Sequence, residues 1–306
     1  MRGTGFQARS MLFLPADAGR FIAKAPQRGA DLIVLDLEDG VARSAKARAR
    51  ASLAAHTAQL QGAGSLVYIR VNHEAALLQD DLVAAVEAGA DGLVLPKVEL
   101  PEQLLRFDDA VSRAEAGAGR TTASVKLIVI IETPKGVCNA AEIARASPRL
   151  VALCFGPEDF ATDMGIAPAR EGLAWPAQAV AIAAVAAGLE PLGMAGSVGD
   201  FSDLAAYREL AHHARSIGVR GGVCIHPAQV EVLNEVFAGS EGEARAAERI
   251  VAAFDKALAD GQGSIALDGR MIDEPIANRA RQFLQRRQGL RQKAAPLPVQ
   301  EGGKAP

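Results

Sequence analysis

The sequence predicts an α/β fold in which strand–helix units close into a (β/α)8 TIM barrel, followed by a C-terminal helical extension. The chain has 306 residues, which fits one barrel of about 250 residues plus an extension. Short apolar runs alternate along it with longer amphipathic segments rich in alanine. The runs are apolar throughout, which is typical of parallel strands covered on both faces. A doubly wound open sheet is the alternative, because counting units does not show closure.

Eight apolar runs are expected to form the strands. They lie at 11–15, 32–37, 66–71, 92–96, 126–131, 150–155, 190–194 and 222–225. The stretches between them have helical patterns, clearest at 46–61, 77–88, 168–187 and 203–216. Residues 1–238 are therefore assigned to a catalytic barrel domain.

The pattern changes after residue 238. Helices are expected at 241–259 and 273–288, joined by a glycine-rich hairpin or loop at 261–271. Residues 239–288 are therefore assigned to the helical extension. The remaining segment, 289–306, is rich in Gln, Pro, Gly and Lys, and is predicted to be a disordered tail.

The composition excludes several classes of protein. Lys and Arg number 33 against 36 Asp and Glu, so a broad basic surface for nucleic acid or an anionic membrane is not expected. No apolar run reaches the roughly 18 residues of a membrane span, and no secretory signal is recognised. The three cysteines are widely spaced and odd in number, which argues against a disulfide framework or a zinc site. A cytoplasmic enzyme is expected.

Charged residues follow nearly every predicted strand, where the strand ends. In a barrel these positions share the C-terminal face, on which active sites are built. Loop polarity alone explains a few of them, but not a charge at almost every strand end. The positions are Asp17, Asp36, Glu38, Asp39, Arg70, Lys97, Glu99, Glu132, Glu158, Asp159 and His226.

Glu132 and Asp159 follow the fifth and sixth predicted strands. On adjacent strands the two carboxylates can converge on one cation, and Mg²⁺ prefers a few carboxylates together with water and substrate oxygens. Capping of the following helices is the alternative reading. The sequence thus indicates a candidate metal site.

Asp36, Glu38 and Asp39 crowd the end of the second predicted strand. Like charges so close are costly unless a cation or an arginine compensates. Arg70 ends the third strand, where its guanidinium suits a carboxylate bidentately or forms an ion pair with Asp39 or Glu99. Both can hold together, with the ion pair orienting Arg70.

Other chemistries fit less well. The chain has no G-x-S-x-G elbow, P-loop or H-E-x-x-H motif. Lys97 and Lys135 can in principle form a Schiff base, which leaves a metal-free aldolase as a competitor. His226 is read either as part of the site wall or as a hydrogen-bonded core residue.

Nine short motifs in fixed order resemble the citrate lyase beta subunit-like family, which includes malyl-CoA and citramalyl-CoA lyases within the HpcH/HpaI aldolase superfamily. The motifs are Arg-Ser-Met-Leu-Phe-Leu-Pro (9–15), Arg-Phe-Ile-Ala-Lys (20–24), Leu-Asp-Leu-Glu-Asp (35–39), Ile-Arg-Val-Asn (69–72), Leu-Pro-Lys (95–97), Ile-Glu-Thr (131–133), Phe-Gly-Pro-Glu-Asp (155–159), Ile-His-Pro (225–227) and Gly-Arg-Met-Ile-Asp (269–273). The chain departs from the family at 193–200, which is richer in glycine, and at 220–224, where the family usually has Gly-Lys before Ile-His-Pro. These departures bear on the substrate rather than on the fold.

The resemblance implies a carbon–carbon lyase that uses Mg²⁺, with Mn²⁺ as a substitute, to cleave or form a 3-hydroxyacyl-CoA thioester. The products of cleavage are an acyl-CoA and a 2-oxo acid, so coenzyme A is part of the substrate. The resemblance assigns the metal to Glu132 and Asp159 and the 2-oxo acid to Arg70. It assigns the phosphates of coenzyme A to Arg20 and Lys24.

The resemblance also implies a homotrimer or hexamer in which Asp273 reaches a neighbouring subunit's active site and acts as the base. Glu38 and Asp39 would orient Arg70 and a water on the metal. One alternative is a citryl-thioester lyase, the citrate lyase beta subunit, acting on an acyl carrier protein. Another is a non-catalytic thioester-binding protein, against which the intact set of site residues argues.

Overall fold

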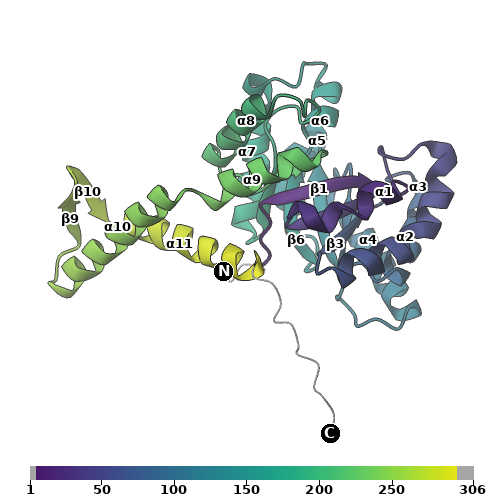
Figure 1. Cartoon of the computed structure of the whole chain (residues 1–306), viewed down its shortest axis with the longest axis horizontal. Helices are drawn as coiled ribbons and strands as arrows, with labels where there is room; N and C mark the ends of the chain where they lie inside the picture. Colours follow the sequence, from purple (N-terminus) through teal and green to yellow (C-terminus); the bar gives the residue numbers. More distant parts are fainter. Residues whose placement is uncertain (1–4, 295–306) are drawn as a thin grey trace, which may run out of the picture. The chain divides into compact units, whose positions relative to one another are not determined.

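The structure is a computed structural model and describes residues 5–294 of the chain (Figure 1). The chain divides into two compact units, Met1–Phe237 and Ala238–Pro306. In the described residues, no helix is long and apolar enough to cross a membrane.

The first unit is built on a ring of parallel strands. They are β1 (Ser10–Pro15), β2 (Leu32–Asp36), β3 (Val67–Arg70), β4 (Gly92–Leu95), β5 (Lys126–Ile131), β6 (Leu150–Phe155), β7 (Glu190–Gly193) and β8 (Gly222–Cys224). Each strand pairs with the next up to β7, and β8 pairs with β1. The ring closes where Arg220 N donates to Pro191 O at 2.8 Å and Gly193 N donates to Gly221 O at 3.0 Å. The predicted (β/α)8 barrel is confirmed and the open sheet is excluded.

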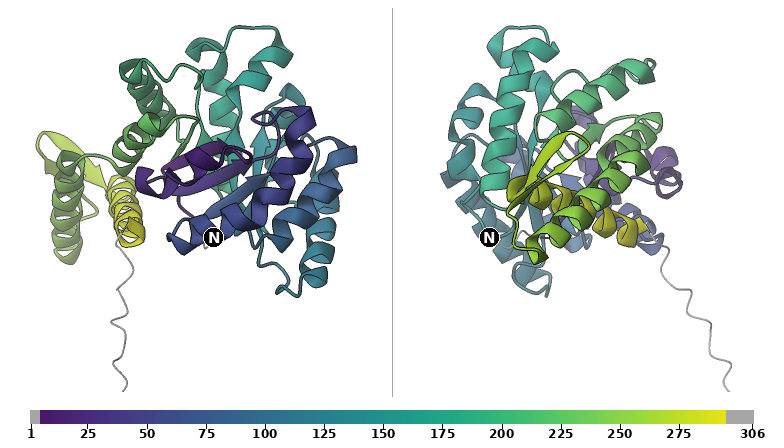
Figure 2. Two further views of the ribbon diagram at one scale, coloured as in Figure 1. Left: turned by 45° about the vertical axis from the view of Figure 1, so that its right-hand side comes forward. Right: turned by 90° about the vertical axis from the view of Figure 1, so that its left-hand side faces the viewer.

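Helices surround the strands on the outside of the ring (Figures 1 and 2). They are α1 (Gly19–Ile22), α2 (Lys46–Gly62), α3 (Ala75–Glu87), α4 (Pro101–Gly117), α5 (Pro134–Ile143), α6 (Pro157–Met164), α7 (Arg170–Ala186), α8 (Leu204–Ser216) and α9 (Pro227–Ala238). Two short 3-10 turns, η1 (Ala25–Arg28) and η2 (Arg43–Ala45), lie among them.

The apolar runs bury both faces of each strand. In β1, Met11 and Phe13 belong to the core inside the ring, whereas Leu12 and Leu14 belong to the core between the ring and the helices. Because a strand's side chains alternate between its two faces, a strand that is buried on both sides needs a continuous apolar run. This explains why β5 and β6 begin and end where the apolar runs predicted.

The junction of β5 with α5 shows how the sequence places a polar group at the strand end. Thr133 is the N-cap of α5, and its side chain accepts a hydrogen bond from Gly136 N at 3.0 Å. Pro134 occupies the first helical position, where the lack of an N–H is harmless. The strand therefore stops at Ile131, and Glu132 is left at the C-terminal face of the barrel.

The second unit contains α10 (Glu241–Ala259), a hairpin of β9 (Ser264–Leu267) and β10 (Arg270–Asp273), and α11 (Glu274–Ala294). The hairpin occupies the link that was expected to be a hairpin or a loop. The helix α11 continues to Ala294, so residues 289–294 are helical and do not belong to a tail. The rest of that segment, 295–306, lies outside the described residues.

Candidate active site

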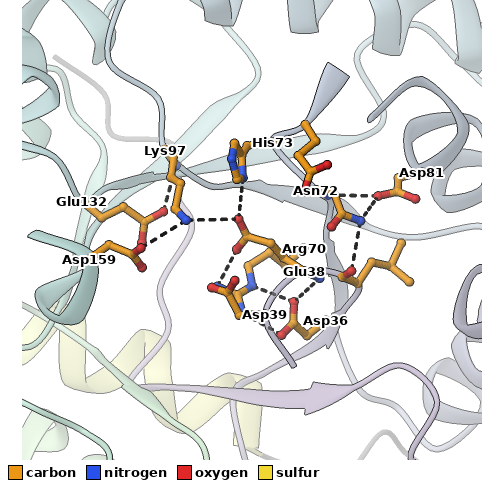
Figure 3. Close-up of polar contacts among 12 residues, drawn as sticks. Asp36, Glu38, Asp39, Arg70, Asn72, His73, Asp81, Lys97, Glu132 and Asp159 are labelled. Carbon is orange, nitrogen blue, oxygen red and sulfur yellow. Dashed lines mark hydrogen bonds and ion pairs between the residues drawn. The ribbon is translucent and has the colours of Figure 1, made fainter. Parts of the chain in front are cut away.

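Charged side chains from neighbouring strand ends converge at the C-terminal face of the barrel (Figure 3). They are Asp36, Glu38, Asp39, Arg70, Lys97, Glu132 and Asp159. A cavity of about 430 Å³ opens here, and its wall includes Arg70, Glu132 and Asp159 beside apolar groups such as Phe13 and Ile130. This is the size range of small-molecule sites.

Arg70 is held by carboxylates on several sides. Its Nε and Nη2 donate to the two oxygens of Asp36 at 2.7 and 2.6 Å, a bidentate contact. Its Nη1 lies 2.9 Å from Glu38 Oε2 and 3.7 Å from Asp39 Oδ2, and its guanidinium carbon lies 5.1 Å from the ring centre of Phe13. Burial lowers the pKa of Arg70, but the hydrogen bonds and charge of Asp36 outweigh it and raise the pKa overall.

The main partner of Arg70 is therefore Asp36, which the sequence placed among the crowded carboxylates but not among the expected partners of Arg70. Asp36 and Arg70 are register partners on β2 and β3, so their side chains leave the sheet side by side. Of the partners expected from the sequence, Asp39 is largely exposed and forms only the longer contact with Arg70, from its Oδ2. Glu99 pairs instead with Lys135 at 3.2 Å.

The loop after β2 is shaped around Asp36. The backbone N–H groups of Glu38 and Gly40 donate to its two oxygens, each at 2.8 Å. A Cβ atom at Gly40 would lie 2.5 Å from Asp36 Oδ2, so only glycine allows this approach. The loop thus fixes the carboxylate that orients Arg70.

A buried polar network supports the same loop from behind (Figure 3). Lys46 Nζ donates to the carbonyls of Leu37 and Glu38 at 2.8 and 2.9 Å and to Asn72 Oδ1 at 2.5 Å. Asn72 in turn donates to Asp81 through its backbone N–H and its side-chain amide. The position of Glu38 is thereby tied to the core beneath α2 and α3.

Glu132, which directly follows β5, and Asp159, in the first turn of α6, approach each other (Figure 3). Glu132 is buried, and burial, together with the charges of Asp159 and Glu38, raises its pKa to about 8. A Cβ atom at Gly156 would lie 2.6 Å from Glu132 Oε2, so glycine is required for this close approach. The hydrogen bond from Lys97 N and the charge of Arg70 lower the pKa of Glu132, but they do not outweigh its burial.

The donor set fits Mg²⁺. The carboxylates of Glu132 and Asp159 line the same cavity, and in the described part of the chain no group of three or more Asp, Glu, His or Cys side chains is arranged to hold a metal. Mg²⁺ keeps several of its waters and is commonly bound by one or two carboxylates plus substrate oxygens.

Lys97 lies between these carboxylates. Its Nζ is 3.1 Å from Asp159 Oδ1, and its backbone N–H donates to Glu132 Oε1 at 2.8 Å. Burial lowers the pKa of Lys97, but the hydrogen bond and charge of Asp159 raise it overall. A Schiff base needs a neutral amine, so this environment disfavours Lys97 as its nucleophile. Lys135 is exposed and paired with Glu99.

Arg20, Lys24 and Asp273 were also predicted as site residues, and His226 as part of the site wall or of the core. Arg20, on α1, and Lys24, just after it, are exposed in the segment that follows β1. His226 stacks on Phe201 with ring centres 4.7 Å apart. Asp273 belongs to the second unit, where it ends β10 and its Oδ1 accepts from Ile276 N at 3.3 Å at the start of α11.

A closed (β/α)8 barrel with a half-buried arginine and paired carboxylates at its C-terminal face has its charged groups where barrel enzymes place their active sites. Residues 9–227 match the HpcH/HpaI aldolase/citrate lyase family. The chain belongs to this family, and the predicted carbon–carbon lyase is confirmed.

Its relatives include lyases that are named after different substrates. The chain is 31% identical to citrate lyase subunit beta of Leuconostoc mesenteroides subsp. cremoris, over 90% of this chain and 92% of that protein. It is 33% identical to L-malyl-CoA/beta-methylmalyl-CoA lyase of Rhodobacter capsulatus, over 87% and 90%. Among solved structures, protein CitE from Mycobacterium tuberculosis in complex with magnesium, acetoacetate and coenzyme A matches with a TM-score of 0.75 and 28% identity, over 93% of this chain and 99% of that one.

Proposed function

We propose that this protein is a Mg²⁺-dependent lyase that cleaves or forms a 3-hydroxyacyl-CoA thioester such as malyl-CoA or citramalyl-CoA, with an acyl-CoA and a 2-oxo acid as the other reactants. The observation that carries the proposal is the convergence of Glu132, Asp159 and Arg70 on one cavity. The name of the malyl-CoA lyase relative supports a coenzyme A thioester as substrate. The complex of protein CitE with magnesium and coenzyme A supports Mg²⁺ as the cofactor and coenzyme A as the group that carries the acyl chain.

Each residue of the cavity has a distinct part in this reaction. Magnesium bound by Glu132 and Asp159 would act as a Lewis acid toward the oxo-acid half of the substrate. Arg70 binds the carboxylate of the 2-oxo acid with the N–H groups that Asp36 and Glu38 leave free, since a guanidinium carries five. Because these carboxylates fix the guanidinium in advance, its charge is preorganised for the transition state.

In the proposed reaction the general base is Asp273, which a neighbouring subunit of a homotrimer or hexamer supplies. In cleavage it would remove the hydroxyl proton, and in condensation the proton of the acyl methyl group. Mixing subunits tests this. Glu132→Ala and Asp273→Asn enzymes should each be nearly inactive, and co-expressed mixtures should regain part of the activity. If verified mixed oligomers regain nothing, the base does not act in trans.

Arg20 and Lys24 are proposed to meet the phosphates of coenzyme A, because both are exposed cations on the segment that follows β1. A cytoplasmic location is part of the same proposal, since that is where free coenzyme A thioesters would be met.

Metal removal tests the central claim. The enzyme should lose activity in EDTA and regain it with Mg²⁺, in assays that combine acetyl- or propionyl-CoA with glyoxylate, pyruvate or oxaloacetate. Glu132→Gln should abolish the Mg²⁺ response. Glu99→Gln is a matched control, because Glu99 lies on the same face but pairs with Lys135. Full activity in EDTA, with substrate-dependent borohydride trapping on a lysine, would overturn the proposal.

A second candidate is a citryl-thioester lyase that acts on an acyl carrier protein, favoured by the similarity to citrate lyase beta subunits. Turnover of a citryl carrier protein, without turnover of any coenzyme A thioester, would establish it.

A further inference from the structure

Lys97 contacts both carboxylates that the proposed function assigns to magnesium (Figure 3). Its backbone N–H donates to Glu132 Oε1 at 2.8 Å, while its Nζ lies 3.1 Å from Asp159 Oδ1. Its φ is 53°, in the left-handed region that is unfavourable for a residue with a Cβ atom. The strained backbone is what allows one residue to reach both groups.

The ammonium of Lys97 and a divalent cation would compete for Asp159. Mg²⁺ binds oxygens directly at about 2.0–2.1 Å, and two cations against one carboxylate oxygen repel each other. The side chain of Lys97 is 26% exposed, so its long stem has room to move. The next anion is Glu38, whose Oε1 is 4.0 Å from Lys97 Nζ.

We propose that Lys97 is an internal counter-ion of the site, a positioning residue that holds Asp159 beside Glu132 and yields to the divalent cation. With a divalent cation held by Glu132 and Asp159, its ammonium would pair with Glu38 in place of Asp159. The inference rests on the proposed metal assignment and adds a residue that sets how tightly the metal is held. It predicts that Lys97 stabilises the enzyme without metal and weakens the binding of metal.

The experiment measures the affinity for Mg²⁺ and the thermal stability of the full-length protein. Calorimetric titration with Mg²⁺ should give a Kd about tenfold lower for Lys97→Met than for the wild type, because a competing positive charge is removed. In EDTA the same variant should melt about 2 °C or more below the wild type, because the paired carboxylates lose their counter-ion. Lys135→Met removes an exposed lysine of the same face and should change neither value appreciably.

In Lys97→Met the melting temperature in EDTA should fall while the affinity for Mg²⁺ rises. Structural damage would instead lower both. Lys97→Asn is the second variant, because asparagine tolerates the left-handed backbone better than methionine does. If both variants bind Mg²⁺ as the wild type does, or more weakly, the counter-ion role is overturned while the proposed function stands. A wild-type protein that binds no Mg²⁺ would overturn the proposed function itself.

Discussion

The barrel has a buried ionic cluster at each end, and the two differ in how well their carboxylates are supplied with hydrogen bonds. At the N-terminal face, Arg149 precedes β6 and donates to both oxygens of Glu115, at 2.9 and 2.8 Å. It also contacts Asp108 and Ser112. Glu115 is fully buried and accepts further bonds from Val125 N and Ala123 N, each within 2.9 Å.

Glu132, in the cluster at the C-terminal face, is also buried, but within residues 5–294 it accepts a hydrogen bond from the N–H of Lys97 alone. The consequences for the pKa are opposite. Burial raises the pKa of Glu115, yet its bonds to Arg149 and the backbone lower it overall, to about 2. Burial dominates at Glu132 and raises its pKa to about 8.

The difference teaches that burial alone does not identify a functional carboxylate. A buried carboxylate whose hydrogen bonds all come from the folded chain stabilises the fold. A buried carboxylate with few such hydrogen bonds can still bind a ligand. The comparison predicts that changes at the N-terminal face act on stability and changes at the C-terminal face act on chemistry.

Arg149→Met should have the largest effect on stability. It leaves the buried Glu115 and the half-buried Asp108 without their cation, and breaking a buried pair typically costs about 3–5 kcal/mol in the free energy of unfolding. Urea denaturation measures it. Arg48→Met is the control, because its ion pair with Asp17 is exposed and should change stability by less than about 0.5 kcal/mol. Equal losses in the two variants would contradict the framework role of the Arg149 cluster.

Arg70→Lys should act mainly on turnover. The variant keeps the charge but not the planar fork that contacts Asp36 and the substrate carboxylate, so kcat/KM should fall by about 100-fold or more. Steady-state kinetics with the best pair of substrates measures it. Arg48→Lys should retain wild-type kinetics. If Arg70→Lys does so as well, Arg70 has no part in the reaction.

The two faces should also respond to pH with opposite sign. The folded pKa of Glu132 is above its ordinary value of 4.5, so in EDTA its contribution to stability is present below about pH 4.5 and is lost as pH rises through about 8. The loss is at most about 1.4 kcal/mol per pH unit for one proton. Glu115 contributes stability above about pH 4.5 that is lost as pH falls through about 2.

Denaturation in EDTA at pH 5.5 and 8.5 checks the sign. Glu132→Gln should reduce the loss of stability between these values, because an amide does not titrate there. Glu115→Gln should leave that difference unchanged. A wild-type protein that gains stability over this range would contradict the raised pKa of Glu132.

Arg20→Ala combined with Lys24→Ala should have the smallest effect. Loss of two exposed cations should raise KM for the coenzyme A thioester several-fold and affect short pantetheine thioesters less, because these lack the nucleotide phosphates. Comparison of the two substrates measures it. If both KM values rise equally, these residues do not bind the nucleotide.

Much of the barrel could be predicted because its signals are local. Continuous apolar runs marked the strands, and for β5 and β6 their limits were correct to the residue. The segment 289–294 was misjudged, because its polar composition suggested a tail and α11 extends through it. The composition of a segment is a property of that segment alone. Whether it is helical also depends on the residues before it, because a helix that is already formed can extend into a polar segment.

The sequence by itself determined which residue types stand at the C-terminal strand ends and, through its ordered motifs, the family. Tertiary structure decided which of them meet. Asp36 faces Arg70 because β2 and β3 pair in that register, and Lys97 reaches Glu132 and Asp159 because a left-handed backbone turns it toward them. Local propensity sets where a strand ends, but register and backbone conformation set the contacts between residues more than 30 positions apart.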